Sequence, residues 1–153
     1  MRRQPYDGVA VACPVTVPYV RYSQETAHWW IARGLRGALD AAGMEPSEID
    51  GLSVSSFTLF PDTPVGLTQH LGLTLRWLDT VPMGGASGVA ALRRAARAVQ
   101  AGDAQVIVCV AGDTNRIDSF RKLLSSFSRF AMDATYPYGF GGPNATFALL
   151  TSA

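Results

Sequence analysis

The stretch "TVPMGGASGVAALRRAARAVQAG", residues 80–102, joins a turn of small residues to an amphipathic helix. Residues 83–88 are called the elbow below. Glycines in the elbow permit positive φ angles and close backbone approach. The start of the helix offers N–H groups and a positive dipole end to an anion or a developing oxyanion. Many enzymes hold a nucleophile at such a turn, and the positions open to one here are Gly85, Ala86 and Ser87.

The segment after the elbow is predicted to be a two-faced helix followed by a strand. The apolar face carries Val89, Leu92, Ala96 and Val99, and the other face largely carries Arg93, Arg94 and Arg97. The run "AQVIVCVAGD", residues 104–113, contains five consecutive apolar residues. Such a run is typical of a strand buried on both faces.

Strands and helices are predicted to alternate along the whole chain. The expected strands are residues 8–15, 51–60, 76–83, 104–113 and 145–153. The expected helices are residues 23–43, with Ala27, Ile31, Leu35, Ala38 and Ala42 on one stripe, then 64–73, the helix after the elbow, and a short one near 120–127. This order predicts one α/β domain over residues 1–153, with a mixed, mostly parallel five-stranded sheet and helices on both faces. Sites on such sheets lie beyond the carboxyl ends of the strands, where the elbow falls.

Composition narrows the class of partner. Apolar residues make up 48% of the 153 residues and charged residues 16%, against about 25% in average soluble chains. This balance indicates that part of the apolar surface is meant for a protein partner. The net charge is +1 without a cluster of Lys and Arg, which argues against nucleic-acid binding.

Cysteine and histidine placement argues against a metal site. Cys13 and Cys109 lie singly inside apolar runs, and His28 and His70 are isolated. Structural zinc requires four such ligands at short spacings. With no disulfide framework, we expect a cytoplasmic protein. Prolines and an acidic residue interrupt the apolar stretch near the N-terminus, so we expect neither a signal peptide nor a membrane span.

Four segments, taken in order and spacing, resemble the N-terminal half of a thiolase. They are "ALDAAGMEPSEIDGL" at 38–52, "TQHLGL" at 68–73, "GGASGVAALRRAARAVQAGDAQVIVCVAGD" at 84–113 and "YPYGFGGPNATFAL" at 136–149. The resemblance covers nearly the whole chain and includes the lipid-transfer-type thiolases. It implies a thiolase-like half with the second half absent from this chain. A truncated piece, a second half on another polypeptide and a stand-alone half all remain open.

The elbow departs from the thiolase pattern at its reactive position. Thiolases carry a Cys just before "A-S-G", and this chain has Gly85 there, which cannot form a thioester. Ser87 matches the helix-start serine of the family, and a serine nucleophile would need a nearby base. We therefore favour Ser87 as the residue that opens the helix over Ser87 as a nucleophile.

Thiolase-like proteins without the elbow Cys include aldolases that cleave β-hydroxyacyl-CoA side chains, among them steroid side chains. These aldolases work with a small partner that carries an OB-fold and often a zinc ribbon. The elbow resembles this branch, which implies a role in lipid metabolism and steroid degradation. It also implies a coenzyme A ester as substrate or ligand, no bound cofactor, and a homodimer or larger assembly.

The resemblance implies further site residues, in the elbow and elsewhere in the chain. Backbone N–H groups of Gly84, Gly85, Ala86 and Gly88 would cradle the CoA ester, and His70 would face the elbow. Arg121, Lys122 and Arg129 would meet CoA phosphates or form a solvated face. The aromatic residues Phe127, Phe130, Tyr136, Tyr138 and Phe140 would line the acyl chain or pack on the missing half. Asp113 is favoured as a turn or helix-cap residue over a functional carboxylate.

Two functions fit these features. The first is a component of an acyl-CoA carbon–carbon lyase or acyltransferase, with acid and base supplied from elsewhere. The second is a non-catalytic acyl-CoA-binding, lipid-binding or structural subunit that completes a partner's site. The missing nucleophile favours the second for this chain in isolation, whereas the retained elbow favours an acyl-binding site over a pure scaffold.

Overall fold

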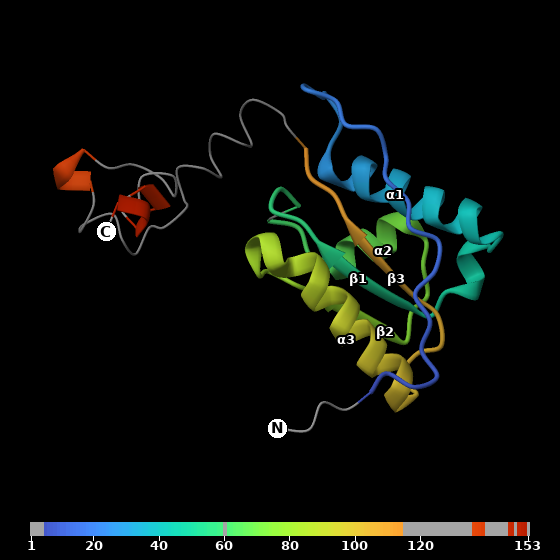
Figure 1. Ribbon diagram of the computed structural model, residues 1–153. Coiled ribbons are helices and arrows are strands. Elements are labelled where there is room, and N and C mark those ends of the chain that lie inside the picture. Colours follow the sequence, from blue (N-terminus) through green and yellow to red (C-terminus); the bar gives the residue numbers. More distant parts are fainter. Residues whose placement is uncertain (1–4, 60, 115–135, 140–146, 149, 153) are drawn as a thin grey trace.

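A computed structural model describes residues 5–59, 61–114, 136–139, 147, 148 and 150–152 (Figure 1). The elements are α1 (Ala27–Ala42), η1 (Pro46–Glu48), β1 (Gly51–Ser55), α2 (Pro64–Leu71), β2 (Trp77–Thr80), η2 (Gly84–Ala86), α3 (Ser87–Ala101), β3 (Ile107–Ala111) and η4 (Tyr136–Tyr138). In the part of the chain so described, no helix is long and apolar enough to cross a membrane.

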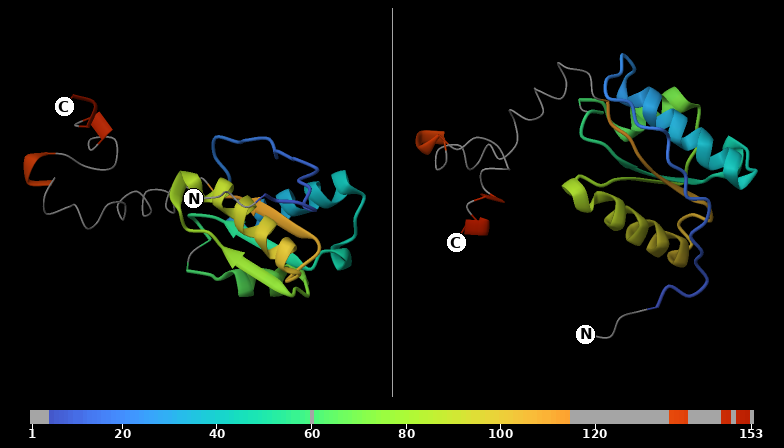
Figure 2. Two further views of the ribbon diagram at one scale, coloured as in Figure 1. Left: turned by 60° about the horizontal axis from the view of Figure 1, so that its bottom comes forward. Right: turned by 45° about the horizontal axis from the view of Figure 1, so that its top comes forward.

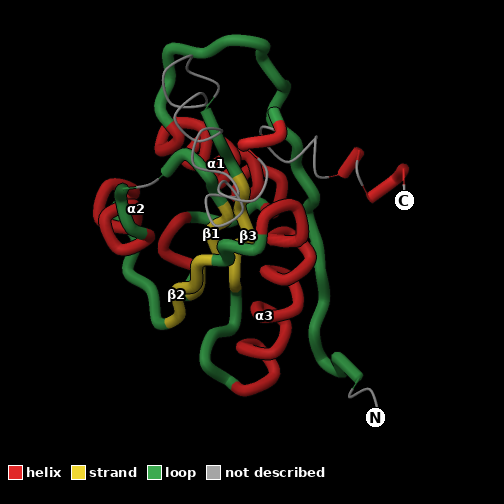
Figure 3. Tube along the Cα trace, turned by 90° about the vertical axis from the view of Figure 1, so that its left-hand side faces the viewer, coloured by secondary structure: helices red, strands yellow, loops and turns green. Residues whose placement is uncertain are grey.

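The three strands form a parallel sheet in the order β2-β1-β3. Helices α1 and α2 cover one face and α3 covers the other (Figures 2 and 3). The predicted α/β class with a parallel sheet and helices on both faces is therefore confirmed. The expected count of five strands is not seen, because three strands account for all sheet residues within the described segments.

The expected strand over residues 8–15 is wrong. This segment runs along the domain without regular structure, and Val11 in its middle is 76% exposed. Gly8 has φ +75° and Cys13 has φ +53°, both left-handed, and Pro14 follows directly. Left-handed backbone breaks the pleat of a strand, and a proline removes a ladder donor.

The expected strand over residues 145–153 is also not formed where the structure describes it. Residues 147, 148 and 150–152 are helical. The hydroxyls of Thr151 and Ser152 donate to the carbonyl oxygens of Phe147 and Ala148 at 2.8 and 3.0 Å, each four residues back. Ala and Leu in this segment favour helix over strand when no neighbouring strand imposes pairing.

Helix α1 follows its sequence signals closely. The Thr26 hydroxyl accepts from the N–H of Trp29 at 3.3 Å, and Gly43 ends the helix with φ +65°. Ala27, Ile31 and Leu35 are buried as predicted. In the last turns Leu39 is buried, whereas the expected Ala38 is half-buried and Ala42 is exposed, so the buried residues follow steps of four along the helix.

The buried face of α3 is not the predicted one. Ser87, Ala91, Ala95 and Ala98 face the sheet. Val89 and Leu92, expected on the apolar face, are 76% and 45% exposed. Small side chains let the axis of α3 approach the sheet closely. The alanine stripe is therefore buried, and the larger residues Val89 and Leu92 are left exposed.

The apolar core lies between the sheet and the α1–α2 layer. It contains large side chains from both helices of that layer and from two strands of the sheet: Ile31, Leu35 and Leu39 of α1, Leu67 of α2, Leu52 and Val54 of β1, and Val110 of β3. Ile31, Leu52, Val54 and Leu67 are fully enclosed. This core fixes the strands whose carboxyl ends carry the candidate site.

Candidate functional site

The carboxyl ends of the three parallel strands define the functional edge of the domain. The elbow follows β2 there, and the turn at residues 56–59 follows β1. Figures 1 and 2 show the loop after β1 and the start of α3 at the same end of the sheet. The sequence predicted this placement for the elbow, since crossover connections bring all helix N-termini to that edge.

The elbow is a single 3-10 turn that runs directly into α3. Gly84 has φ +59°, a left-handed value that disfavours any residue with a Cβ. The backbone then tightens through Gly85 and Ala86, and the N–H of Ser87 donates to the carbonyl of Gly84. A Cβ built at Gly84, Gly85 or Gly88 meets no atom of the described residues within 4 Å. The space above these glycines is therefore open to a ligand.

Ser87 takes part in the shape of the elbow. Its hydroxyl accepts from the N–H of Met83 at 3.0 Å, and the residue is 8% exposed. This contact closes the turn across four residues. It agrees with the interpretation of Ser87 as the residue that opens the helix.

Asp113 joins the turn after β1 to the end of β3. Its Oδ1 accepts from the Ser56 hydroxyl at 2.9 Å, from the N–H groups of Phe57 and Thr58 at 2.7 and 2.9 Å, and from the Thr58 hydroxyl at 2.9 Å. The favoured interpretation of Asp113 as a residue of its own turn or as a helix cap stays a prediction, because the bonds of its carboxylate go to residues 56–58. The turn that it organises is 55 residues away in sequence, which local turn chemistry could not reveal.

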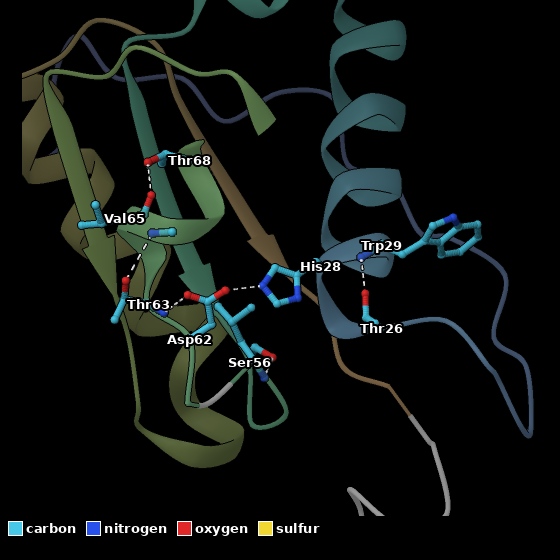
Figure 4. A network of polar contacts seen from close by, with 10 residues as sticks. Thr26, His28, Trp29, Ser56, Asp62, Thr63, Val65 and Thr68 are labelled. Carbon is cyan, nitrogen blue, oxygen red and sulfur yellow. Dashed lines mark hydrogen bonds and ion pairs between the residues drawn. The ribbon is translucent and has the colours of Figure 1, made fainter. Parts of the chain in front are cut away.

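The two histidines lie together on the α1–α2 side of the sheet. The rings of His28 and His70 meet edge to face with centroids 5.7 Å apart. His28 Nε2 lies 2.6 Å from Asp62 Oδ2, at the start of α2 (Figure 4). The hydrogen bond from His28, then that from the Thr63 N–H, holds the pKa of Asp62 below its usual value. His70 thus contacts His28 on one layer, while the elbow opens α3 on the other.

The opposite, α3-covered face of the sheet carries small and polar groups. Ser53 pairs in register with Asp79 and Cys109, and Asp79 forms an ion pair with Arg94 of α3 at 3.3 Å. The hydroxyls of Ser53 and Ser55 are buried and have no hydrogen-bond partner among the residues that the structure describes. Burial, then the nearby Asp79 carboxylate, raises the pKa of the Cys109 thiol, which keeps it protonated and unreactive.

A groove of about 820 Å³ runs from the elbow along the outer side of α3 beside β2. Its lining includes Met83 and Ala86 of the elbow, Val89 and Arg93 of α3, and Trp77 of β2. Strand β2 is at the edge of the three-stranded sheet, so one side of it has no strand partner among the described residues. The groove thus combines apolar side chains, three arginines, two aspartates and an open strand edge.

Several expected site residues fall outside the described residues. These are Arg121, Lys122, Phe127, Arg129, Phe130 and Phe140. Of the aromatic segment, Tyr138 is described, and it is 75% exposed. Within the described residues, no group of three or more His, Cys, Asp or Glu side chains is placed to hold a metal ion.

Two curated proteins and two solved structures are similar to parts of this chain. No protein-family model matches the chain. It is 34% identical over 73 residues, 47% of this chain and 18% of the relative, to the steroid side-chain-cleaving aldolase of Thermomonospora curvata. It is 28% identical over 128 residues, 78% of this chain and 32% of the relative, to the 17-hydroxy-3-oxo-4-pregnene-20-carboxyl-CoA lyase of Mycobacterium tuberculosis.

Solved structures agree on the fold. The Ltp2-ChsH2(DUF35) aldolase matches with a TM-score of 0.64 and 25% identity, over 83% of this chain and 32% of that one. An OleA variant from Xanthomonas campestris matches with a TM-score of 0.57 and 21% identity, over 70% of this chain and 34% of that one. The chain thus spans about a third or less of the length of these proteins. The predicted resemblance to thiolase-like enzymes, including thiolase-like aldolases, is confirmed.

Proposed function

We propose that this chain is the elbow-bearing component of an acyl-CoA lyase that cleaves a carbon–carbon bond by a retro-aldol reaction. One observation carries the proposal: the elbow keeps its left-handed Gly84 and its helix start, yet Gly85 has no side chain. The names of the two curated relatives, an aldolase and a carboxyl-CoA lyase, support the same class of reaction.

A retro-aldol cleavage has no need of an elbow nucleophile. A base removes the proton of the β-hydroxyl group, the carbonyl of the leaving aldehyde or ketone forms, and the bond between the α and β carbons breaks. Its electron pair moves onto the thioester as an enolate, which an acid then protonates at carbon. N–H donors aimed at the thioester oxygen stabilise that enolate, and such donors supply a large share of catalysis in related chemistry.

We assign the cradle for the thioester oxygen to the backbone of Gly84, Gly85 and Gly88. Ala86, also expected in the cradle, donates its N–H to the carbonyl of Met83 at 3.2 Å. The open space above the three glycines supports the assignment, because a ligand oxygen can reach the backbone. Arg121 and Arg129 remain our proposal for the CoA phosphates. The base and the acid would come from other parts of the assembly, since Ser87 is engaged within the elbow.

We further propose that the site is completed in a larger assembly. The groove beside α3, the exposed Val89 and Leu92, and the open edge of β2 support a protein partner on this side. A homodimer through this side is one form, and an OB-fold or zinc-ribbon partner is another. The same observations favour the second candidate function, a non-catalytic acyl-CoA-binding or structural subunit that completes a partner's site.

Activity assays separate these candidates. The purified chain, alone and with copurifying proteins, is incubated with β-hydroxyacyl-CoA and β-ketoacyl-CoA esters, and the products of retro-aldol cleavage and of thiolysis are measured. The proposal expects retro-aldol cleavage with partners present. Ester binding without either reaction would leave the non-catalytic subunit, and thiolysis that persists with Gly85 in place would overturn our interpretation of the elbow.

A further inference from the structure

The turn at residues 56–59 is held by several hydrogen bonds at one end, where Phe57 is exposed, and by the buried side chain of Leu59 at the other. Four donors converge on one oxygen of Asp113, and two of them are backbone N–H groups of the turn. The Ser56 hydroxyl in turn accepts from the N–H of Leu59 at 3.1 Å. Hydrogen bonds to a charged group are stronger than those between neutral groups.

A second set of hydrogen bonds connects this turn, through Thr114, to the segment before α1. The N–H of Thr114 donates to the Thr58 hydroxyl at 2.9 Å, and the Thr114 hydroxyl donates to the carbonyl of Glu25 at 2.6 Å. Gly112 makes this approach possible, because a Cβ there would lie 3.0 Å from the Ile31 side chain and 3.2 Å from its backbone nitrogen. Three segments distant in sequence are thus fixed at one edge.

This edge is also where the elbow lies. Surface loops usually tolerate motion, whereas loops that position ligands are held rigidly by the scaffold. The turn presents the Phe57 ring, 41% exposed, at the edge of the sheet. The Asp113 oxygen is already occupied by four donors of the protein's own fold, so its role differs from that of an acid or base that touches substrate.

We propose that Asp113 is a positioning residue that holds the turn at 56–59 as a fixed wall of the CoA-ester site. The inference rests on the proposed function, since it requires an ester beside the elbow. The position of this turn depends on the hydrogen bonds of the Thr58 hydroxyl. A variant that retains the hydroxyl should hold the turn in place, and a variant of the same shape that lacks the hydroxyl should not.

The test uses the full chain and two variants of nearly equal shape. Thr58→Ser keeps both bonds of the hydroxyl, and Thr58→Val can make neither. Asp113→Ala removes the carboxylate, and Asp40→Asn on the exposed surface of α1 is the control. Affinity for a short and a long 3-hydroxyacyl-CoA is measured by titration calorimetry, and hydrogen exchange is followed at the amides of Phe57 and Thr58.

The inference expects Thr58→Val and Asp113→Ala to weaken ester binding by about tenfold or more, which corresponds to about 1.4 kcal/mol. Both should speed exchange at the two amides while α1 and α2 stay protected. Thr58→Ser and Asp40→Asn should behave as wild type. Faster exchange with unchanged affinity, or loss of affinity in Thr58→Ser, would overturn the inference and leave the proposed function standing. Absence of ester binding by the wild-type chain, measured together with its copurifying proteins, would overturn both.

Discussion

The two faces of the sheet are built on different principles. The face under α1 and α2 packs large aliphatic side chains, and four of them are fully enclosed. The face under α3 packs alanines against Ser53, Ser55 and Cys109, while the larger apolar residues of α3 point outward. The first face is a self-sufficient core. The second face buries less apolar surface, because its small side chains bring α3 close to the sheet. Val89 and Leu92 of α3 are therefore left exposed on a surface suited to a partner.

The largest effect is expected from removing volume on the α1–α2 face. Leu52→Ala empties a site that is 0% exposed in the middle of β1. Leu-to-Ala changes in rigid cores lower the free energy of unfolding by about 2–5 kcal/mol. Urea unfolding followed by circular dichroism measures the loss. A loss below about 1 kcal/mol would mean that this core is not the main source of stability.

The α3 face should instead be sensitive to added volume. Ala95 is 6% exposed and lies on the buried stripe of α3. Ala95→Leu forces α3 away from the sheet, and overpacking of this kind costs about 1–3 kcal/mol. Ala90→Leu, at a half-buried position of the same helix, is the matched control. Equal unfolding midpoints for the two variants would contradict the close approach of α3.

Gly84 and Gly85, two of the three elbow glycines, should differ from each other. Gly84 has φ +59°, so Gly84→Ala places a Cβ in a disfavoured conformation at a cost of about 1 kcal/mol. Gly85 does not have a left-handed φ, and a Cβ there meets no atom within 4 Å. Gly85→Ala should therefore fold with little loss of stability, and thermal unfolding of both variants measures the difference.

The same geometry lets the thiolase nucleophile be put back. Gly85→Cys should fold as well as Gly85→Ala and react with iodoacetamide, since the space above the position is open. Peptide mapping by mass spectrometry after alkylation checks the reaction at this position, and the wild-type chain, which has Cys13 and Cys109, is the control. A Gly85→Cys chain that folds but resists alkylation would show that the elbow is closed and would weaken the assignment of the cradle.

How much the sequence could predict depends on whether a feature is local. Helix ends and the elbow follow from short-range signals such as the glycines at 43, 72 and 102, and these are found. Helix α1, however, begins at Ala27 after the Thr26 cap, four residues later than predicted. The face of α3 was mispredicted because periodicity gives the spacing of a stripe, while packing against the sheet decides which stripe is buried. The bonds of Asp113 to residues 56–58 could not be predicted, since they depend on the register of β1 and β3.

Substitutions on the outer side of α3 should have the smallest effect on folding and the clearest effect on assembly. Val89 and Leu92 lie on the outer side of α3, 76% and 45% exposed. Val89→Ser and Leu92→Ser together should change the free energy of unfolding by about 0.5 kcal/mol or less, as surface substitutions usually do. If this surface binds a partner or a second copy, the double variant should shift toward the monomer mass in sedimentation velocity, because exposed apolar side chains anchor protein interfaces. Val11→Ser, on the irregular segment before α1 and also 76% exposed, separates a specific interface from general loss of apolar surface. An unchanged assembly in the double variant, or an equal shift in Val11→Ser, would argue that α3 owes its outward apolar residues to the close packing of its alanine stripe alone.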